Sequence, residues 1–204
     1  HIPNLLTFSR LLLALVGFWW LAQLVESGGQ AGTMEAAALA SFWFLLFAVV
    51  TDFLDGHIAR KYGWVSSIGR IADPVVDKVL ILGIMVYLVA CPFLGLPADL
   101  HPIMPIWFVI LVLTREFLVT ALRGLVESHG LEFPADPVGK WKMILQSIYV
   151  LTLIGVPAGV PDLIFLPFLK HLRDPWPIAF LFASVVVLTI WSGCHYCFRG
   201  VRLL

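Results

Sequence analysis

Long apolar stretches separated by short polar breaks dominate the pattern along this chain. A membrane-spanning helix needs roughly 20 mostly apolar residues, and six stretches approach that length: 9–26, 37–60, 69–91, 103–127, 139–157 and 176–198. The breaks hold clustered glycines and prolines, as in SGGQAG at 27–32, CPFLGLPADLHP at 91–102, EFPADP at 132–137 and VPAGVPD at 156–162. The pattern predicts an all-α integral membrane protein with six transmembrane helices, organised as one domain over residues 1–204.

Two further apolar segments are too short to cross a bilayer. IPNLLTFSR at 2–10 is expected to lie on the membrane surface before the chain turns into the first span. DLIFLPFLKHL at 162–172 carries a central proline and is expected to be interfacial as well. The predicted fold therefore includes an N-terminal interfacial segment in addition to its six spans.

Composition supports the membrane assignment. Of the 204 residues, 60% are hydrophobic and 13% are charged, whereas about half and a quarter are typical of a soluble domain. The formal net charge of zero gives no indication of a nucleic-acid partner. Three cysteines cannot form a disulfide framework, and Cys194 and Cys197 beside His195 are a weak zinc signal. We interpret these three residues as structural.

The distribution of Lys and Arg predicts the orientation of the spans, because cytoplasmic ends of membrane helices are enriched in both. With the N-terminus inside, eleven basic residues fall on the inner side and two, Lys170 and Arg173, on the outer side. The inner set is Arg10, Arg60, Lys61, Arg70, Lys78, Arg115, Arg123, Lys140, Lys142, Arg199 and Arg202. We predict both termini in the cytoplasm, most simply in a bacterial inner membrane.

Four aspartates lie within or beside apolar stretches, at Asp52, Asp55, Asp73 and Asp77. A charge at the bilayer centre costs about 2.5–3.5 kcal/mol on insertion scales, so such acids are candidates for function. On a helix, Asp52 and Asp55 fall within an arc of about 140° that also holds Gly56, Ala59 and Arg60. Asp73 and Asp77 are four residues apart on the next helix and share a face. Two acidic faces joined by a short loop can meet.

Four crowded carboxylates would repel each other unless cations neutralise them. An all-oxygen ligand set favours Mg²⁺ or Mn²⁺ over zinc, and two such ions can clamp phosphate oxygens during displacement at phosphorus. Arg60 could hold a further phosphate. The alternative is that the acids are solvated helix-end charges paired with neighbouring basic residues. The alignment of four acids on two facing stripes favours the metal site.

The motif D-x-x-D-G-x-x-A-R, eight residues, then G-x-x-x-D-x-x-x-D resembles the signature of the CDP-alcohol phosphotransferase family. The fixed positions are Asp52, Asp55, Gly56, Ala59, Arg60, Gly69, Asp73 and Asp77, and all of them match. The resemblance implies six transmembrane helices, a homodimer and two metal ions held by the four aspartates. It implies that Asp77 is the base that deprotonates an acceptor alcohol, whose oxygen attacks the β-phosphorus of a CDP-linked lipid and releases CMP. It also implies contacts with the CDP moiety by Gly56, Ala59, Arg60 and Ser66, and more weakly by Asn4 and Thr7.

Members of this family differ in their acceptor, so other cations near the inner side matter. Arg115 and Arg123 are eight residues apart, about 80° around a helix, and Lys140 and Lys142 open the next span. Such a cluster suits a small phosphorylated acceptor, with Glu116 available as partner of an arginine. The alternative, strongest for the two lysines, is that the cations only anchor helix ends. R-E-x-x-x-x-x-x-R followed by K-W-K resembles the branch that joins CDP-diacylglycerol to sn-glycerol 3-phosphate.

Three alternatives stay open at this point. The first keeps the family and changes the acceptor to inositol phosphate, serine or phosphatidylglycerol. The second is an intramembrane prenyltransferase, which would also use paired acids and Mg²⁺ on a diphosphate. The third is a cation transporter, although the repeat symmetry common in transporters is not evident in this sequence.

Overall fold

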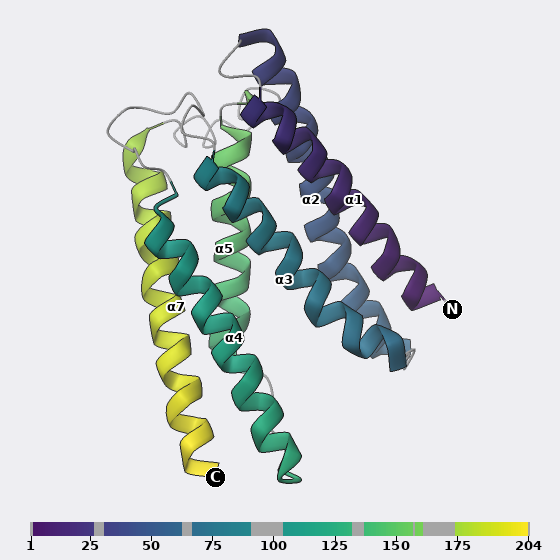
Figure 1. Ribbon diagram of the computed structural model, residues 1–204, viewed down its shortest axis with the longest axis vertical. Helices are drawn as coiled ribbons and strands as arrows, with labels where there is room; N and C mark the ends of the chain where they lie inside the picture. The colour runs from purple at the N-terminus through teal and green to yellow at the C-terminus, as the bar shows by residue number, and fades with distance from the viewer. Residues whose placement is uncertain are drawn as a thin grey trace.

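The fold was analysed on a computed structural model that describes residues 2–26, 31–62, 67–90, 104–131, 137–156, 158–160 and 174–203. Within α1, α2, α3 and α5 the side chains of 2–8, 24, 31–34, 52–62, 67–74, 77 and 137 lie outside this description. The helices are α1 (Ile2–Glu26), α2 (Ala31–Tyr62), α3 (Ser67–Ala90), α4 (Ile106–Ser128), α5 (Pro137–Gly155) and α7 (Pro175–Leu203). The prediction of an all-α fold is confirmed for the described residues (Figure 1).

Each predicted span coincides with one helix, and the ends of α3, α4 and α5 differ from the prediction by no more than a few residues. The agreement has a simple cause, because the polar and Gly/Pro-rich breaks coincide with the gaps between helices. Among the described residues, α7 is the one helix that is both long and apolar enough, on length and composition, to cross a membrane. Six membrane spans therefore remain a prediction.

The expected turn between an N-terminal segment and the first span is wrong. α1 runs as one helix of 25 residues from Ile2 to Glu26. Proline at position 3 falls in the first turn, where its missing N–H would have no intrahelical partner in any case. No glycine or proline follows before Gly17, so nothing in the sequence interrupts the helix. The other short segment, 162–172, lies outside the described residues.

The helices alternate in direction, and in Figure 1 the N-terminus marks the lower end of α1 and the C-terminus the lower end of α7. α1 packs against α2 and α3, α5 packs against α2 and α7, and α4 packs against α7. α3 also contacts α4 and α5, so it joins the two halves of the molecule. Because the helices alternate in direction, the helix ends that the sequence assigns to the inner side lie at the same end of the bundle, whereas Lys78 and Arg115 lie near the middle of α3 and α4.

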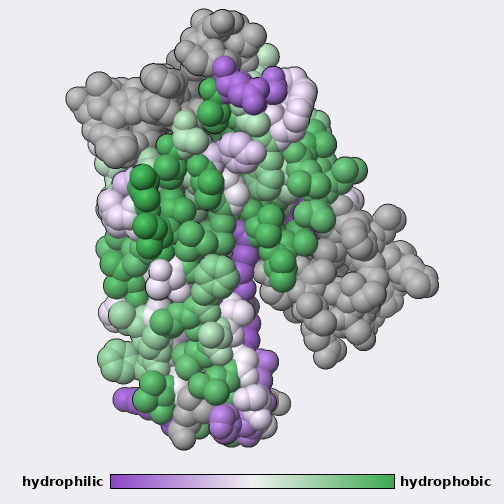
Figure 2. Space-filling view, in the orientation of Figure 1, coloured by the Kyte–Doolittle hydropathy of each residue, from purple (hydrophilic) through white to green (hydrophobic). Residues whose placement is uncertain are grey.

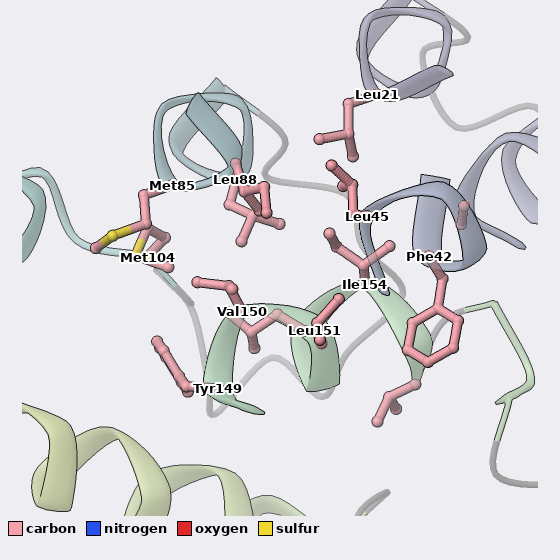
Figure 3. Close-up of a cluster of buried hydrophobic side chains, with 14 of the residues drawn as sticks. Leu21, Phe42, Leu45, Met85, Leu88, Met104, Tyr149, Val150, Leu151 and Ile154 are labelled. Carbon is pink, nitrogen blue, oxygen red and sulfur yellow. The ribbon is translucent and has the colours of Figure 1, made fainter. Parts of the chain in front are cut away.

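Apolar side chains fill the interior and also cover the outside. All six described helices contribute to the core. In Figure 3, Leu21, Leu45, Leu88, Val150 and Ile154 converge from α1, α2, α3 and α5. Figure 2 shows hydrophobic side chains over most of the described part of one face, with hydrophilic residues near its two ends and in a narrow strip between. Large apolar side chains on these outer surfaces are at least half exposed, among them Trp19, Phe47, Phe117, Phe180 and Phe198. A surface this apolar is unusual for a soluble monomer.

Glycines allow the helices to approach closely at two places in the core. A Cβ added to Gly17 of α1 would lie 2.8 Å from the fully buried Leu45 side chain of α2. One added to Gly155 of α5 would lie 2.8 Å from the Phe42 ring. Small residues at helix contacts are typical of membrane proteins, because they let backbones come together.

A pair of glycine substitutions tests this packing. Gly17→Ala should lower the free energy of unfolding by about 1–3 kcal/mol, since the new methyl group overpacks the α1–α2 contact. Gly124→Ala, where nothing lies within 4 Å of the added Cβ, should be neutral or stabilise α4 by about 0.5–1 kcal/mol. Thermal unfolding of the purified protein in detergent measures both. Equal effects of the two substitutions would contradict the close approach at Gly17.

Candidate functional site

The predicted metal ligands fall on the ends of two consecutive helices. Asp52 and Asp55 lie in the last third of α2, and Asp73 and Asp77 lie in the first half of α3. Because α2 and α3 are continuous there, the spacing places each pair on one helix face, as the sequence predicted. The carboxylates themselves lie outside the described side chains, so the metal centre remains a prediction. Among the described side chains, no three His, Cys, Asp or Glu could hold a metal ion together.

The predicted nucleotide contacts lie outside the described side chains as well. Gly56, Ala59 and Arg60 fall in the last two turns of α2, and Asn4 and Thr7 in the first two turns of α1. Ser66 lies in the segment between α2 and α3 that the structure leaves undescribed. The roles of the signature residues therefore remain predictions from the sequence. The side-chain geometry described below belongs to α3, α4, α5 and α7.

A buried ion triad joins α4 to α5. One oxygen of the Glu116 carboxylate, Oε1, accepts hydrogen bonds from Arg115 Nη1 and from Lys142 Nζ, each at 2.8 Å. The exposed fractions of the three side chains are 9% for Arg115, 18% for Glu116 and 5% for Lys142. Lys142 is thus buried inside the bundle, which argues against its being a solvated helix-end anchor. Such residues are seldom buried unless they are paired.

The triad is linked to the helix that carries two of the aspartates. Lys78 Nζ of α3 donates to Thr120 Oγ1 of α4 at 2.8 Å, and the Thr120 hydroxyl donates to the Glu116 carbonyl at 2.7 Å. Lys78 directly follows Asp77 in the sequence. The α3 turn that bears Asp77 is therefore attached to the stretch of α4 that bears Arg115 and Glu116.

α7 completes the surroundings of Arg115 with residues that the sequence interpretation missed. Ser192 Oγ accepts a hydrogen bond from Arg115 Nε at 3.2 Å, and the Tyr196 ring centroid lies 5.5 Å from Arg115 Cζ. A signal was present, because Thr189, Ser192 and Tyr196 form a polar stripe at spacings of three and four in an otherwise apolar helix. Neutral polar residues in such a stripe are easily taken for packing.

The four predicted acceptor-phosphate residues separate into two groups. Arg115 and Lys142 meet at Glu116, as described above. Arg123 lies two turns further along α4, and Lys140 is exposed; among the described residues, neither forms a hydrogen bond or ion pair with the triad. Arg123 Nε is buried without a hydrogen-bond partner in that part of the chain. The expectation that Glu116 partners an arginine is confirmed.

Charge and hydrogen bonding are both left incomplete at the triad. Among the described side chains, Arg115, Lys142 and nearby Lys78 carry three positive charges and Glu116 supplies one negative charge, so two positive charges are in excess. Arg115 Nη2 is buried and has no hydrogen-bond partner among the described residues. A buried donor without a partner costs free energy, and an anion is the ligand that would remove both deficits. The arrangement can therefore bind an anion between α4 and α5.

Cys194 and Cys197 are free, and Cys194 is exposed on α7 rather than buried. Among the described residues, neither cysteine is hydrogen-bonded to the triad.

Comparison with known proteins agrees with the signature motif. A family model described as CDP-alcohol phosphatidyltransferase matches residues 1–191. A probable phosphatidylglycerophosphate synthase of Mycobacterium tuberculosis H37Rv is 31% identical over 204 residues, covering 99% of this chain and 82% of the relative. A CDP-diacylglycerol–glycerol-3-phosphate 3-phosphatidyltransferase of Bacillus subtilis is 30% identical over 161 residues, or 76% of each chain. A CMP-forming cardiolipin synthase of Streptomyces coelicolor is 32% identical over 129 residues, covering 63% of this chain and 53% of the relative.

The chain belongs to the CDP-alcohol phosphatidyltransferase family. Membership makes it a transferase of phospholipid biosynthesis, and it rules against the prenyltransferase and transporter alternatives. The matched region ends at residue 191, just before Ser192 and Tyr196 of α7.

The buried triad leads to a stability prediction. Glu116→Ala should lower the free energy of unfolding by about 3 kcal/mol, because it leaves Arg115 and Lys142 buried together without their shared carboxylate. Glu127→Ala removes an exposed carboxylate from the same helix and should change stability by less than about 0.5 kcal/mol. Thermal or denaturant unfolding in detergent compares the two. A Glu116→Ala protein as stable as the Glu127→Ala protein would mean that the triad is not formed.

Proposed function

We propose that this protein transfers the phosphatidyl group from CDP-diacylglycerol to sn-glycerol 3-phosphate, which yields phosphatidylglycerophosphate and CMP. This is the activity of a phosphatidylglycerophosphate synthase. Family membership supports the reaction class, and the names of the M. tuberculosis and B. subtilis relatives point to this acceptor. The observation that carries the acceptor is the buried Arg115–Glu116–Lys142 triad, with its excess positive charge and the unpartnered Nη2 of Arg115.

The proposed setting is a bacterial inner membrane, with six spans and both termini in the cytoplasm. Three features support it: the alternating helix directions, the basic residues toward one end, and the apolar outer surfaces (Figures 1 and 2). The site would then open to the cytoplasm, where a water-soluble acceptor can enter while the lipid donor stays in the bilayer. A homodimer is proposed from the family resemblance alone.

The proposed metal centre consists of Asp52, Asp55, Asp73 and Asp77. Four carboxylates from two adjacent helix segments make an all-oxygen ligand set, which fits Mg²⁺ or Mn²⁺. When bound, two such ions would neutralise the diphosphate of the donor and polarise its phosphorus. The chemistry of these residues therefore fits a divalent pair.

The remaining steps fall to groups of the protein itself. Gly56, Ala59, Arg60 and Ser66, with Asn4 and Thr7, would hold the CDP moiety. Asp77 would accept the proton of the acceptor hydroxyl, and that oxygen would form a bond to the β-phosphorus as the bond to CMP breaks. Arg115 and Lys142 would bind the acceptor phosphate, with Arg123 and Lys140 contributing to its attraction from the cytoplasm.

The contact between α3 and α4 supports the assignment of proton removal to Asp77 and of phosphate binding to Arg115 and Lys142. Asp77 and Lys78 are neighbours, and Lys78 donates to Thr120, one turn from Glu116. One end of a small acceptor could therefore lie at Asp77 while its phosphate lies at Arg115 and Lys142. A phosphate monoester carries about two negative charges at neutral pH, which matches the two positive charges in excess when the triad is counted together with Lys78 among the described side chains. The phosphodiester of phosphatidylglycerol carries only one.

An acceptor panel tests the proposal. Purified protein with CDP-diacylglycerol should release CMP when given sn-glycerol 3-phosphate and Mg²⁺ or Mn²⁺. Glycerol is the matched control, because it offers the same hydroxyls without the phosphate and should give no release. A chelator should stop the reaction, and added Mg²⁺ or Mn²⁺ should restore it. CMP release with phosphatidylglycerol, serine or inositol phosphate instead would assign the protein to another branch of the family.

The proposed base has its own test. Asp77→Asn should reduce turnover at least about a hundredfold, within the range that general-base catalysis contributes, while the protein still binds the cytidine nucleotide. CMP release measures turnover, and equilibrium dialysis with labelled nucleotide measures binding. Asp174→Asn, an exposed position at the start of α7, is the control and should keep full activity. Near-normal turnover of Asp77→Asn would remove Asp77 from this role.

A further inference from the structure

We propose that Ser192 of α7 is a positioning residue that, together with the Tyr196 ring, sets the orientation of the Arg115 guanidinium for the acceptor phosphate. The inference rests on the proposed function, since it takes Arg115 as a phosphate ligand. It adds the last helix to the acceptor site and assigns a role to two neutral side chains beyond the region that the family model matches.

Ser192 is fully buried, and its hydroxyl has two defined partners. The oxygen accepts from Arg115 Nε at 3.2 Å, and the hydroxyl donates to the Thr189 carbonyl of its own helix at 3.2 Å. Because the proton is directed to Thr189, a lone pair of the oxygen faces Arg115. Ser192 therefore acts toward Arg115 as an acceptor with a fixed direction.

Two in-plane hydrogen bonds determine how a planar guanidinium lies. Arg115 Nε is held by Ser192 and Nη1 by Glu116, at 3.2 and 2.8 Å. The Tyr196 ring lies against the same guanidinium, with 5.5 Å between Cζ and the ring centroid, a distance suited to a cation–π contact. With Nε and Nη1 each bonded, Nη2 is the guanidinium nitrogen that has no partner among the described residues and can bind a ligand.

The free donor faces the start of α5. A Cβ added to Gly139, in the first turn of α5, would lie 3.5 Å from Arg115 Nη2. Lys142 follows one turn later, and the beginning of a helix carries unsatisfied N–H groups and partial positive charge. An anion bound by Nη2 would therefore lie close to Lys142 and to the positive end of α5. A second glycine, Gly193, leaves room for the arginine stem, since a Cβ there would lie 3.3 Å from Arg115 Cγ.

The main test separates acceptor binding from turnover. Ser192→Ala should raise the KM for sn-glycerol 3-phosphate about three- to tenfold, the range expected for one hydrogen bond to a charged group. The KM for CDP-diacylglycerol, kcat and the thermal unfolding midpoint should stay close to wild type. Ser184→Ala is the matched control, because among the described residues that hydroxyl, on the same helix, bonds the Phe180 carbonyl alone, at 2.8 Å, and its loss should leave every parameter unchanged.

Making Ser192→Ala in an Arg115→Lys protein as well shows whether Ser192 acts by orienting Arg115 or by packing between helices. Lysine has no Nε, so Ser192→Ala should have no further effect on the acceptor KM in an Arg115→Lys protein. An equal effect in both backgrounds would show that Ser192 acts through helix packing and would overturn the proposal. If Arg115→Lys itself left the acceptor KM unchanged, the proposed acceptor site would fail. If Arg115→Lys raised KM and Ser192→Ala did not, only the role of Ser192 would fail.

Tyr196 gives an independent check that does not depend on how Ser192→Ala folds. Tyr196→Phe keeps the ring against the guanidinium and should keep the acceptor KM within about twofold, whereas Tyr196→Leu should raise it about threefold or more. Equal acceptor KM values for the two variants would overturn the contribution of the ring.

Discussion

The part of the structure outside the motif depends on one shared oxygen, Glu116 Oε1. It accepts from Arg115 on its own helix and from Lys142 on α5, and so allows two cations to be buried side by side. Without it, burial of either cation would be strongly unfavourable. The other contacts of this region start from the same place: Ser192 and Tyr196 bring α7 to Arg115, and Thr120 brings Lys78 of α3 to the Glu116 carbonyl. The carboxylate thus joins α4 to α5 directly, α7 is joined to it through Arg115, and α3 is joined to the backbone of the same residue through Thr120.

The two halves of the molecule are held by different means. α1 and α2 pack through close apolar contacts, such as Gly17 against Leu45, and need no polar group there. α4, α5 and α7 share the charged cluster in addition to their apolar contacts. α3 touches both halves, and it carries Asp73 and Asp77. α2, which packs against α5, and α3 both connect the halves. α3 also connects the predicted metal site with the anion site, because it carries Asp77 and Lys78.

The length and breaks of the apolar stretches were enough to predict the helices, because each Gly/Pro-rich break coincides with a helix end. The sequence analysis did not predict that α1 is continuous. The absence of Gly and Pro between Pro3 and Gly17 permits one long helix, but it does not exclude a turn between a surface segment and a span. It could not separate Lys140 from Lys142 either. The two lysines are about 200° apart around a helix, and which side of α5 faces α4 is decided by tertiary packing. Ser192 and Tyr196 were missed because a neutral polar residue becomes informative only when its partner is known.

The incompleteness of the charged cluster is what distinguishes a binding site from a structural ion pair. A network that serves only to hold helices together would be expected to balance its charges and satisfy its donors, because every deficit costs stability. Here Nη1 and Nε of Arg115 are satisfied by Glu116 and Ser192, whereas Nη2 is buried and is not. Counted over the described side chains of this cluster and Lys78, two positive charges are also in excess. The free-energy cost of this unpartnered donor falls beside the first turn of α5. A small dianion bound there would offset it by accepting a hydrogen bond from Nη2 and neutralising the charge.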